Sequence, residues 1–417
     1  MEINGAQMFV KALQEEHVDT LFAYPGGTAI DLFDALYDAE GIDMILPRHE
    51  QALVHAADGY ARSTGKVGVC LVTSGPGATN LVTGIATANY DSVPLVCFTG
   101  QVPMNLIGND AFQEVDIVGI TRNICKYAVT VRKREDLARI IKNAFYIART
   151  GKPGPVLVDI PKDIQLAMGS DEYPDEVNIR GYKPSEGVHS GQLKKALAEL
   201  NHAKKPVFLI GGGVNIAHAR KEMQELCELT GIPVVTTIMG KGAIPTDHPL
   251  YVGNIGMHGN LASNKAIMEC DVLFSIGTRF NDRITGTIDT FAKNAKILQI
   301  DVDPVEINKN ICVSASIIGD VKAVLTVINR RLEAQEHKEW LDTVKEYKEK
   351  YPLTYDKGRL TCPEIMEAIY DITKGEAVIT TEVGQHQMWA AQFYKYDKPR
   401  KFLTSGGLGT MGYGLGA

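Results

Sequence analysis

The sequence predicts an α/β protein in which doubly wound parallel sheets are divided among more than one domain. Continuous apolar runs such as VGVCLVT, residues 67–73, are typical of strands buried on both faces. Stretches with the apolar spacing of helices separate these runs, and this alternation is typical of parallel sheets covered by helices. The chain has 417 residues, which is too many for one ordinary core.

The first predicted domain covers residues 1–165. Helices are expected on the apolar face of Ala6, Phe9 and Leu13, on that of Ile30 and Leu36, after about His49, and after the turn at 74–77,. The expected strands occupy residues 20–25, 43–47, 67–73, 94–100 and 155–161.

Residues 166–189 are polar and contain proline, so they are expected to form a linker,. A second alternating region follows at 190–335 and predicts a second domain. Its expected strands lie at 205–213, 232–237, 271–277 and 296–303, with a helix at 321–332.

Residues 336–362 are interpreted as a second linker, because 333–357 are rich in Glu, Lys and Tyr and resemble a solvated helix. The last stretch, 363–417, has two expected strands, at 377–384 and 401–405, and ends in the glycine-rich run SGGLGTMGYGLGA. An independent parallel domain normally needs about four strands or more, so this third domain is predicted to be incomplete.

Composition excludes several classes of protein. The net charge is −7 without a long basic run, which argues against nucleic acid or an anionic membrane as a partner. The N-terminus lacks the pattern of a signal peptide, and no apolar run approaches the roughly 18 residues of a membrane span. The seven cysteines show no CxxC spacing, so we expect buried free thiols in a reducing cytosol.

Glycine turns follow two of the expected strands in the first domain. YPGG stands at 24–27, and SGPGATN stands at 74–80. Open α/β sheets bind ligands at the carboxyl ends of their strands, and Glu50 also follows a strand directly. Together these features point to a cleft. Taken alone, each turn is equally explained as a tight structural turn, and Glu50 as a solvated carboxylate at the positive end of a helix dipole.

The second region has a weaker signal for a nucleotide. GGG at 211–213 is not the GxGxxG fingerprint and is as well explained by a plain turn,. In GTRFNDR, residues 277–283, the side chains of Arg279 and Arg283 share one face if the segment is helical,. They could then grip a diphosphate or a carboxylate. The alternative is a surface ion pair with Asp282.

A set of short segments runs in one order along the chain: YPGG at 24–27, PRHEQALVHAADGYAR at 47–62, SGPGATN at 74–80, DAFQE at 110–114, GKPGPVLVDIPKD at 151–163, GMHG at 256–259, GTRFNDR at 277–283, VGQHQMW at 383–389 and GGLGTMGYG at 406–414. In this order they resemble the catalytic large subunit of acetohydroxyacid synthase, also called acetolactate synthase. DAFQE, RFNDR and GQHQMW are the most specific of them.

The resemblance implies three α/β domains of the thiamine diphosphate enzyme architecture. The first would bind the aminopyrimidine, the central one FAD, and the third, from 363, the diphosphate through Mg²⁺. It further implies a cytoplasmic homodimer or homotetramer with active sites between subunits, and a small regulatory subunit as partner. The implied reaction decarboxylates pyruvate and transfers the two-carbon unit to pyruvate or 2-oxobutyrate, in branched-chain amino acid biosynthesis.

The resemblance also implies roles for individual residues. Glu50 would hydrogen-bond N1′ of the cofactor, and Gly27 would supply a backbone donor. Phe112, Gln113 and Lys162 would line the substrate channel, and Arg283 would hold the second keto acid. The implied thiamine diphosphate contacts are Tyr24, Pro25, Glu50, Thr73, Gly77, Asn80, Val383, Gly384, Gln385, His386, Gly409 and Met411. The implied FAD contacts are Lys152, Gly211, Gly212, Gly213, Thr237, Met257, His258, Gly277, Arg279, Arg283, Asp301, Asp320 and Val321.

The sequence departs from the family in three places. Lys152 stands where many relatives have arginine, so a bidentate grip on FAD becomes a point charge, and Asn281 replaces a common aspartate. The family's Mg²⁺ ligands follow the glycine run, so they are expected beyond Ala417, and we expect the 417 residues alone to have little activity. Two alternatives remain: a thiamine enzyme such as a flavin-independent catabolic acetolactate synthase or a pyruvate oxidase, and a non-catalytic nucleotide-binding module.

Overall fold

The computed structural model describes residues 1–184 and 187–417. These residues form two compact units, each described here by itself. The first contains residues 1–184, 380–383 and 403–417, and the second contains residues 187–379 and 384–402. Ser185 and Glu186, which fall within the linker expected at 166–189, lie outside the described residues. None of the described helices is long and apolar enough to cross a membrane.

The first unit is built on a six-stranded parallel sheet of order β3-β2-β4-β5-β7-β6. Every residue of β4, β5 and β7 is buried, which confirms the prediction of strands covered on both faces. The strands are β2 (Thr20–Ala23), β3 (Asp43–Ile45), β4 (Gly68–Val72), β5 (Leu95–Gln101), β6 (Tyr127–Thr130) and β7 (Pro155–Pro161). A short antiparallel pair, β1 (Glu2–Asn4) and β8 (Met168–Ser170), lies outside this sheet.

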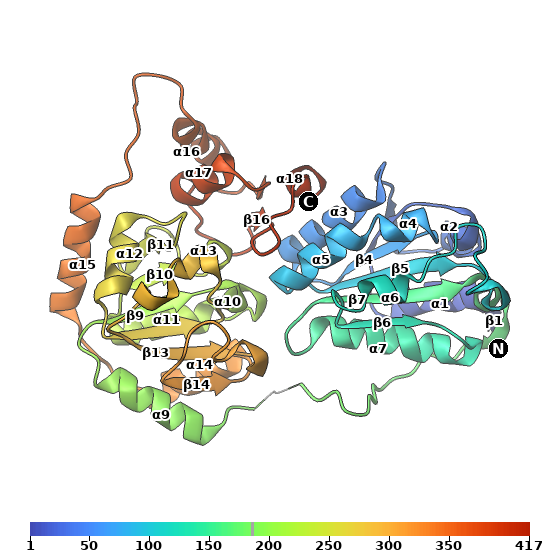
Figure 1. The fold of residues 1–417 in the computed structure, drawn as a ribbon, viewed down its shortest axis with the longest axis horizontal. Coiled ribbons are helices and arrows are strands. Elements are labelled where there is room, and N and C mark those ends of the chain that lie inside the picture. Colours follow the sequence, from blue (N-terminus) through green and yellow to red (C-terminus); the bar gives the residue numbers. More distant parts are fainter. Residues whose placement is uncertain (185–186) are drawn as a thin grey trace. The chain divides into compact units, whose positions relative to one another are not determined.

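Helices cover both faces of this sheet (Figure 1). One core cluster joins the strands to α1 (Gly5–Glu15), α2 (Ile30–Tyr37) and α7 (Leu137–Arg149), and another joins them to α3 (Glu50–Thr64) and α5 (Val82–Asp91). Side chains of one strand alternate between the clusters: Val69 and Leu71 pack in the first, Cys70 and Val72 in the second. The shorter helices are α4 (Pro76–Thr79), α6 (Ile117–Thr121) and α8 (Lys162–Leu166).

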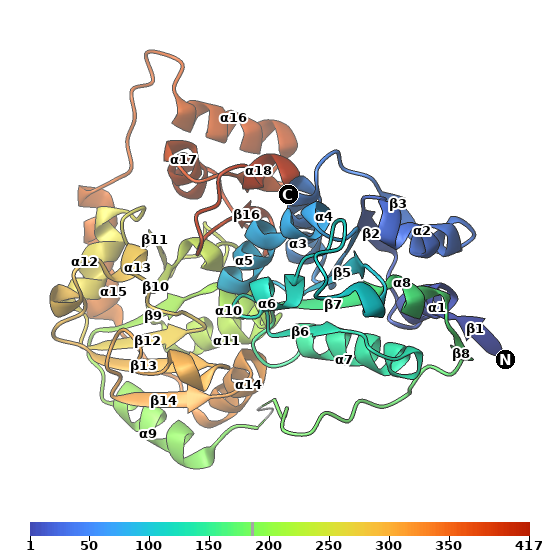
Figure 2. The same ribbon diagram turned by 45° about the vertical axis from the view of Figure 1, so that its right-hand side comes forward.

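The second unit repeats this plan with a parallel sheet of order β11-β10-β9-β12-β13-β14 (Figure 2). Its strands are β9 (Pro206–Ile210), β10 (Val234–Thr236), β11 (Tyr251–Asn254), β12 (Val272–Ile276), β13 (Lys296–Asp301) and β14 (Ala315–Ile318). Its helices include α9 (Ser190–Asn201), α10 (Gly212–Ile216), α11 (Arg220–Thr230), α12 (Leu261–Glu269), α13 (Asp282–Thr285) and α14 (Val321–Arg331).

Helix α15 (Lys338–Lys350) differs from the solvated helix that its composition predicts. Trp340 and Val344 are 3% and 1% exposed and belong to the core cluster on one face of the second sheet. The indole N–H of Trp340 donates to the carbonyl of Pro206 at 3.0 Å. The expectation was wrong because two apolar residues one helical turn apart are enough to bury one stripe of an otherwise charged helix.

The C-terminal residues form one strand pair and three helices. The strands β15 (Ile379–Thr381) and β16 (Phe402–Thr404) pair with each other. The helices are α16 (Cys362–Thr373) and α17 (Gln385–Phe393) in the second unit and α18 (Tyr413–Gly416) in the first. Of the cysteines, Cys70, Cys97, Cys227 and Cys270 are buried, whereas Cys312 is exposed.

A buried carboxylate joins three strands of the first sheet. Asp159 of β7 is 1% exposed and accepts hydrogen bonds from the Thr99 hydroxyl at 2.7 Å, the Thr130 hydroxyl at 3.1 Å and the Gln101 amide at 3.2 Å. Burial raises the pKa of Asp159 to about 6, although these hydrogen bonds offset part of the shift. Burial therefore favours the protonated form more in the folded state than in the unfolded chain,.

Replacing Asp159 with Asn should remove a pH dependence from the stability of the first unit. A folded pKa of about 6 lies above the unfolded value, so the stabilisation is complete below pH ~4 and is lost as the pH rises through ~6. Between those limits the free energy of unfolding of Asp159→Asn should gain about 3 kcal/mol relative to wild type. Urea unfolding at several pH values measures this. The exposed Asp175→Asn is the control, and equal pH slopes in all three proteins would contradict the assignment.

Candidate functional site

The turns YPGG and SGPG pack against each other where β2 and β4 end. The Oγ1 atoms of Thr28 and Thr73 are 3.0 Å apart, and the backbone N–H of Ser74 donates to Thr28 Oγ1 at 3.1 Å. A Cβ on Gly26 would lie 2.5 Å from that of Thr73, so only glycine permits this approach. Next to it, Gly27 has open space where a Cβ would point, and its backbone can be approached by a ligand.

Glu50 lies at the same edge, at the first position of α3. Its side chain is half-buried, and its Oε2 accepts a hydrogen bond from the Asn80 amide at 2.9 Å. A Cβ on Gly77 would lie 3.5 Å from Glu50 Oε1. The structure therefore brings together Glu50, Asn80 and Gly77, which are distant in sequence. Glu50 also lies in the first turn of α3, as the alternative of a carboxylate at the positive end of a helix dipole requires, but it is half-buried and not fully solvated.

Lys162, the first residue of α8, reaches the YPGG turn. Its ammonium donates to the carbonyl of Gly27 at 3.3 Å and lies 3.6 Å from the carboxylate of Asp31. The side chain is 35% exposed, so its positive charge remains accessible to an anionic substrate beside Gly27.

The DAFQE segment rests against the SGPG turn. The carboxylate of Glu114 accepts the backbone N–H groups of Gly108 at 2.5 Å and Ala111 at 3.2 Å. Gln113 has a φ of +59°, and a Cβ on Gly75 would lie 2.7 Å from its carbonyl oxygen. Thr28 and Glu114 were not among the sequence-predicted residues. Thr28 directly follows the YPGG motif, and Glu114 is the last residue of DAFQE.

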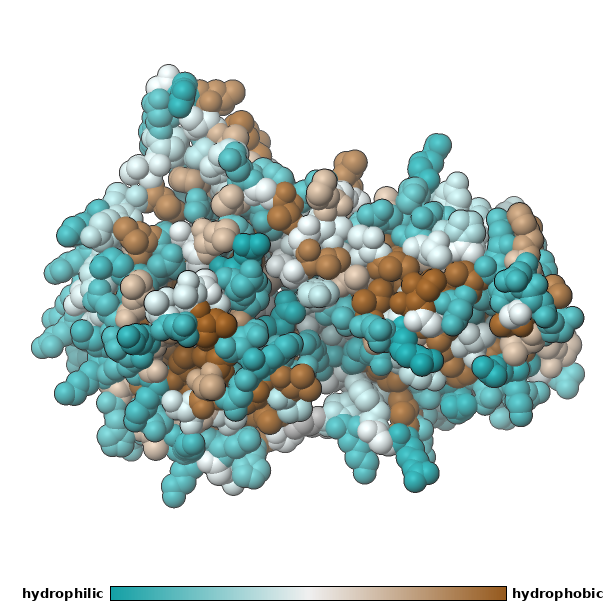
Figure 3. Space-filling view, viewed as in Figure 1, coloured by the Kyte–Doolittle hydropathy of each residue, from teal (hydrophilic) through white to brown (hydrophobic). Residues whose placement is uncertain are grey.

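Phe112 is 86% exposed. Hydrophobic side chains gather on the face of the first unit where α5 and α6 lie in Figure 1 (Figure 3). The exposed side chains Leu106 and Ile120 belong to the same stretch of chain, 104–121. The Phe112 side chain is therefore available to line a substrate channel.

The predicted thiamine contacts near the C-terminus fall into two groups. Gly409, with a φ of +74°, and Met411, 80% exposed, lie in the first unit. Val383 also belongs to the first unit, whereas Gly384, Gln385 and His386 lie in the second, at the start of α17. Open backbone at Gly27 and Gly409, a hydrogen-bonded half-buried carboxylate and exposed apolar side chains fit an aromatic, charged cofactor. Among the described residues, no cluster of three His, Cys, Asp or Glu side chains could hold a metal.

The glycine turns of the second unit also meet at one edge of their sheet. The backbone N–H of Gly213 donates to the carbonyl of Gly277 at 3.1 Å. A Cβ on Gly211 would lie 2.1 Å from that carbonyl oxygen and 2.3 Å from Thr278 Oγ1. Gly212 shares the turn, and the backbone N–H of Thr237, after β10, donates to Ile210. Close packing of the two turns thus requires glycine at 211 and 213, whereas a Cβ on Gly212 would lie 3.1 Å from that of Met239.

Polar groups line the ends of the same strands. Thr278 is buried, and its hydroxyl has no hydrogen-bond partner in the structure. The backbone N–H of Met257 donates to the carbonyl of Arg283 at 2.9 Å. Burial, with the nearby charge of Arg283, lowers the pKa of His258, so its imidazole is neutral at neutral pH. An orphaned hydroxyl, a neutral imidazole and accessible arginines fit a dinucleotide such as FAD.

Arg279 and Arg283 do not share a helical face. Helix α13 begins at Asp282, and Arg279 precedes it in irregular backbone, so the condition under which the two side chains would share a face is not met. Phe280, which lies between them, has a φ of +52°, outside the range of a right-handed helix. The surface ion pair considered as an alternative does exist, since Arg283 lies 3.7 Å from Asp282 and both are exposed.

The remaining predicted FAD residues differ in their surroundings. Asp301 ends β13 and accepts the backbone N–H of Asp303 at 3.0 Å. Asp320 caps α14 through the N–H of Ala323 at 2.9 Å, and Val321 is buried, so both have structural roles. Lys152 lies in the first unit. Asn281, a departure from the family, caps α13 through Ile284, which aspartate would do equally well.

Comparison with known proteins finds matches along most of the chain. Three family models match: thiamine pyrophosphate enzyme, N-terminal TPP binding domain, at 3–120; central domain, at 193–328; and C-terminal TPP binding domain, at 382–417. An acetolactate synthase large subunit of Haemophilus influenzae is 46% identical over 100% of this chain and 74% of its own length. A probable acetolactate synthase large subunit of Methanocaldococcus jannaschii is 48% identical over 100% and 72%. Acetolactate synthase isozyme 3 large subunit of Escherichia coli is 45% identical over 100% and 74%.

Adding one methyl group at Gly211 should disrupt the edge of the second sheet. In Gly211→Ala the new Cβ meets a backbone carbonyl that cannot move aside, so we expect a loss of about 2 kcal/mol or more in the free energy of unfolding. Urea unfolding of the purified proteins measures this loss. Gly187→Ala, which has open space in the same unit, is the control. Equal stability of the two variants would show that the turns can separate.

Proposed function

Since the chain belongs to the family of acetolactate synthase large subunits, which are thiamine diphosphate enzymes, we propose that Glu50 is its catalytic carboxylate. The proposed reaction decarboxylates pyruvate and transfers the two-carbon unit to a second molecule of pyruvate or to 2-oxobutyrate. Thiamine diphosphate, when bound, supplies the carbon that takes up this unit. The observation that carries the proposal is the half-buried Glu50, held by Asn80 beside the two glycine turns.

Glu50 would hydrogen-bond N1′ of the aminopyrimidine and hold a proton there. Its Oε2 already accepts from Asn80, so Oε1 is left to face the ring, next to Gly77. An amide that fixes the carboxylate keeps it from rotating away, and such preorganisation lowers the cost of reaching the reactive geometry.

The substrate would bind between the YPGG turn and the DAFQE segment. The backbone N–H of Gly27 would stabilise the oxyanion that develops from the keto oxygen. Lys162 lies beside the same glycine and would attract the keto acid carboxylate. Phe112 and Gln113 would exclude water, which otherwise protonates the transferred unit. Arg283 would hold the carboxylate of the second keto acid.

We further propose FAD and Mg²⁺ as cofactors, and self-association into dimers or tetramers. The glycine turns, Thr278 and the two arginines of the second unit support FAD, which in this family has no redox part in the net reaction. The relatives named above are large subunits by name, and this supports a small regulatory subunit as a partner. A flavin spectrum without oxidase activity would separate this proposal from a pyruvate oxidase.

Glu50→Gln tests the central assignment, in the protein expressed from its complete reading frame. The amide keeps the size of the side chain but cannot hold the proton. Because positioned proton transfer contributes about 100-fold or more, kcat for acetolactate formation should fall by at least that factor, while bound flavin is unchanged. The exposed Glu40→Gln is the control and should keep wild-type turnover. Full turnover in Glu50→Gln would remove Glu50 from the mechanism.

A further inference from the structure

A buried charge cluster lies at the ends of α3 and α5 that are remote from Glu50. The guanidinium of Arg62 binds Asp58 through Nε at 2.5 Å and Asp91 through Nη2 at 2.9 Å. The side chains of Arg62, Asp58 and Asp91 are 9%, 0% and 1% exposed. Burial alone would lower the pKa of Arg62, but the surrounding Asp58, Tyr413 and Asp91 together outweigh it and raise that pKa well above its ordinary value.

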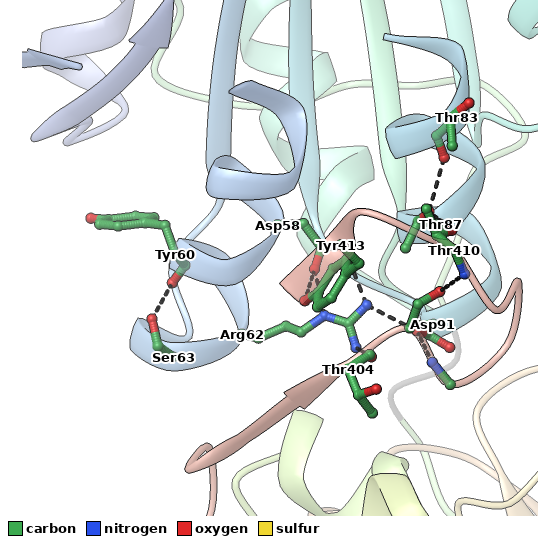
Figure 4. Close-up of polar contacts among 12 residues, drawn as sticks. Asp58, Tyr60, Arg62, Ser63, Thr83, Thr87, Asp91, Thr404, Thr410 and Tyr413 are labelled. Atoms are coloured by element: carbon green, nitrogen blue, oxygen red, sulfur yellow. Dashed lines mark hydrogen bonds and ion pairs between the residues drawn. The ribbon is translucent and has the colours of Figure 1, made fainter. Parts of the chain in front are cut away.

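Each member of this cluster also bonds to the C-terminal segment 403–417 of the same unit. Arg62 Nη1 donates to the carbonyl of Thr404 at 3.0 Å. The backbone N–H of Gly406 donates to Asp91 Oδ2 at 2.9 Å, and the Tyr413 hydroxyl donates to Asp58 Oδ1 at 2.7 Å. Figure 4 shows Arg62 between the two aspartates and the ring of Tyr413. The cluster thus bonds to both ends of the loop formed by residues 404–413.

Further contacts fix the same loop ends. The ring of Tyr413 is fully buried between Arg62, 5.3 Å from its centroid, and His55, at 5.4 Å. Near the middle of the loop, Thr410 Oγ1 lies 2.6 Å from Thr87 Oγ1, and its N–H donates to Ser405. A Cβ on Gly59 would lie 2.7 Å from Ala417, so α18 packs directly against α3.

The tip of the loop, by contrast, is open. Met411 is 80% and Leu408 38% exposed, and a Cβ on Gly409 or Gly412 would meet no atom within 4 Å. A structural role alone does not explain this arrangement. A buried ion pair adds little net stability, and apolar side chains of similar size would hold α3 and α5 together equally well. The charged groups add directional bonds: to backbone atoms of Thr404 and Gly406 before the glycine-rich tip, and to the side-chain hydroxyl of Tyr413 after it.

We propose that Arg62 is a positioning residue for cofactor binding, which holds both ends of the 404–413 loop so that its tip keeps the shape that binds thiamine diphosphate. This inference rests on the proposed function. Arg62 does not touch the cofactor; it acts through Asp91, Thr404 and Tyr413. Glu50 and Arg62 lie on the same helix, about 18 Å apart along the axis at ~1.5 Å per residue, so one rigid element carries the catalytic carboxylate and the anchor of the loop.

Arg62→Lys tests the role, because lysine keeps the charge but cannot bond Asp58, Asp91 and Thr404 at once. In the protein expressed from its complete reading frame, KM for thiamine diphosphate should rise at least ten-fold, while KM for pyruvate and bound flavin stay within two-fold. The control is Arg139→Lys, an exposed residue of α7 paired with Asp136. A purely structural role would lower the melting temperature without changing KM for the cofactor.

Hydrogen exchange without cofactor gives a second readout. In Arg62→Lys the amides of Gly406 and Thr410 should exchange at least ten-fold faster, with those of β4 and β5 unchanged. If β4 and β5 also exchange faster, Tyr413→Phe replaces the test, since it removes only the hydroxyl bond to Asp58 and should change loop exchange and cofactor KM in the same direction.

The outcomes separate the two proposals. An active wild type whose Arg62→Lys variant keeps both KM for thiamine diphosphate and the exchange rate of Gly406 overturns this inference alone. A wild-type protein that forms no acetolactate with thiamine diphosphate and Mg²⁺ overturns the proposed function itself.

Discussion

Parallel pairing of strands is the constraint on which both units depend. In each six-stranded sheet every strand runs in the same direction, so the turns that follow the strands crowd at one edge. Crowded backbone leaves no room for side chains, and Gly26 and Gly211 sit where a Cβ would collide with a neighbouring turn. At these positions the packing of the fold by itself is enough to require glycine, whether or not a ligand binds. The proposed ligand binding would use the backbone that remains open, as at Gly27.

The central strands and most helices could be predicted from the sequence, because burial on both faces imposes continuous apolar runs such as β4 and β7. The edge strands β6, β11 and β14 were missed. The residues of β6 and β14 are partly exposed and carry no such run, whereas β11 is buried but has the short sequence YVGN, in which glycine and asparagine interrupt the apolar pattern. Glu50 and the SGPG turn could be grouped because each follows a strand. The hydrogen bond between Tyr413 and Asp58 joins positions 355 residues apart, and no local sequence pattern predicts it.

Three carboxylates of the first unit differ in whether their surroundings leave an oxygen available to a ligand. Asp159 is buried among neutral donors, which raises its pKa to about 6 and leaves it without access to a ligand. Asp58 is buried against a guanidinium and a phenol, so its lone pairs are used within the protein. Glu50 is half-buried with an amide on one oxygen. Of the three, only Glu50 combines a fixed position with an oxygen open to a ligand.

The anchored loop resolves a conflict between flexibility and binding. A glycine-rich segment approaches a cofactor closely, but it loses more conformational entropy on ordering than any other kind of segment. If that loss occurred on binding, it would weaken cofactor affinity directly. Bonds from Arg62 and Asp91 to the backbone of Thr404 and Gly406 order the loop ends during folding instead. Packing of α18 on α3 then compensates for this entropy loss, and the proposed binding of thiamine diphosphate would only have to order the exposed tip at Gly409 and Met411.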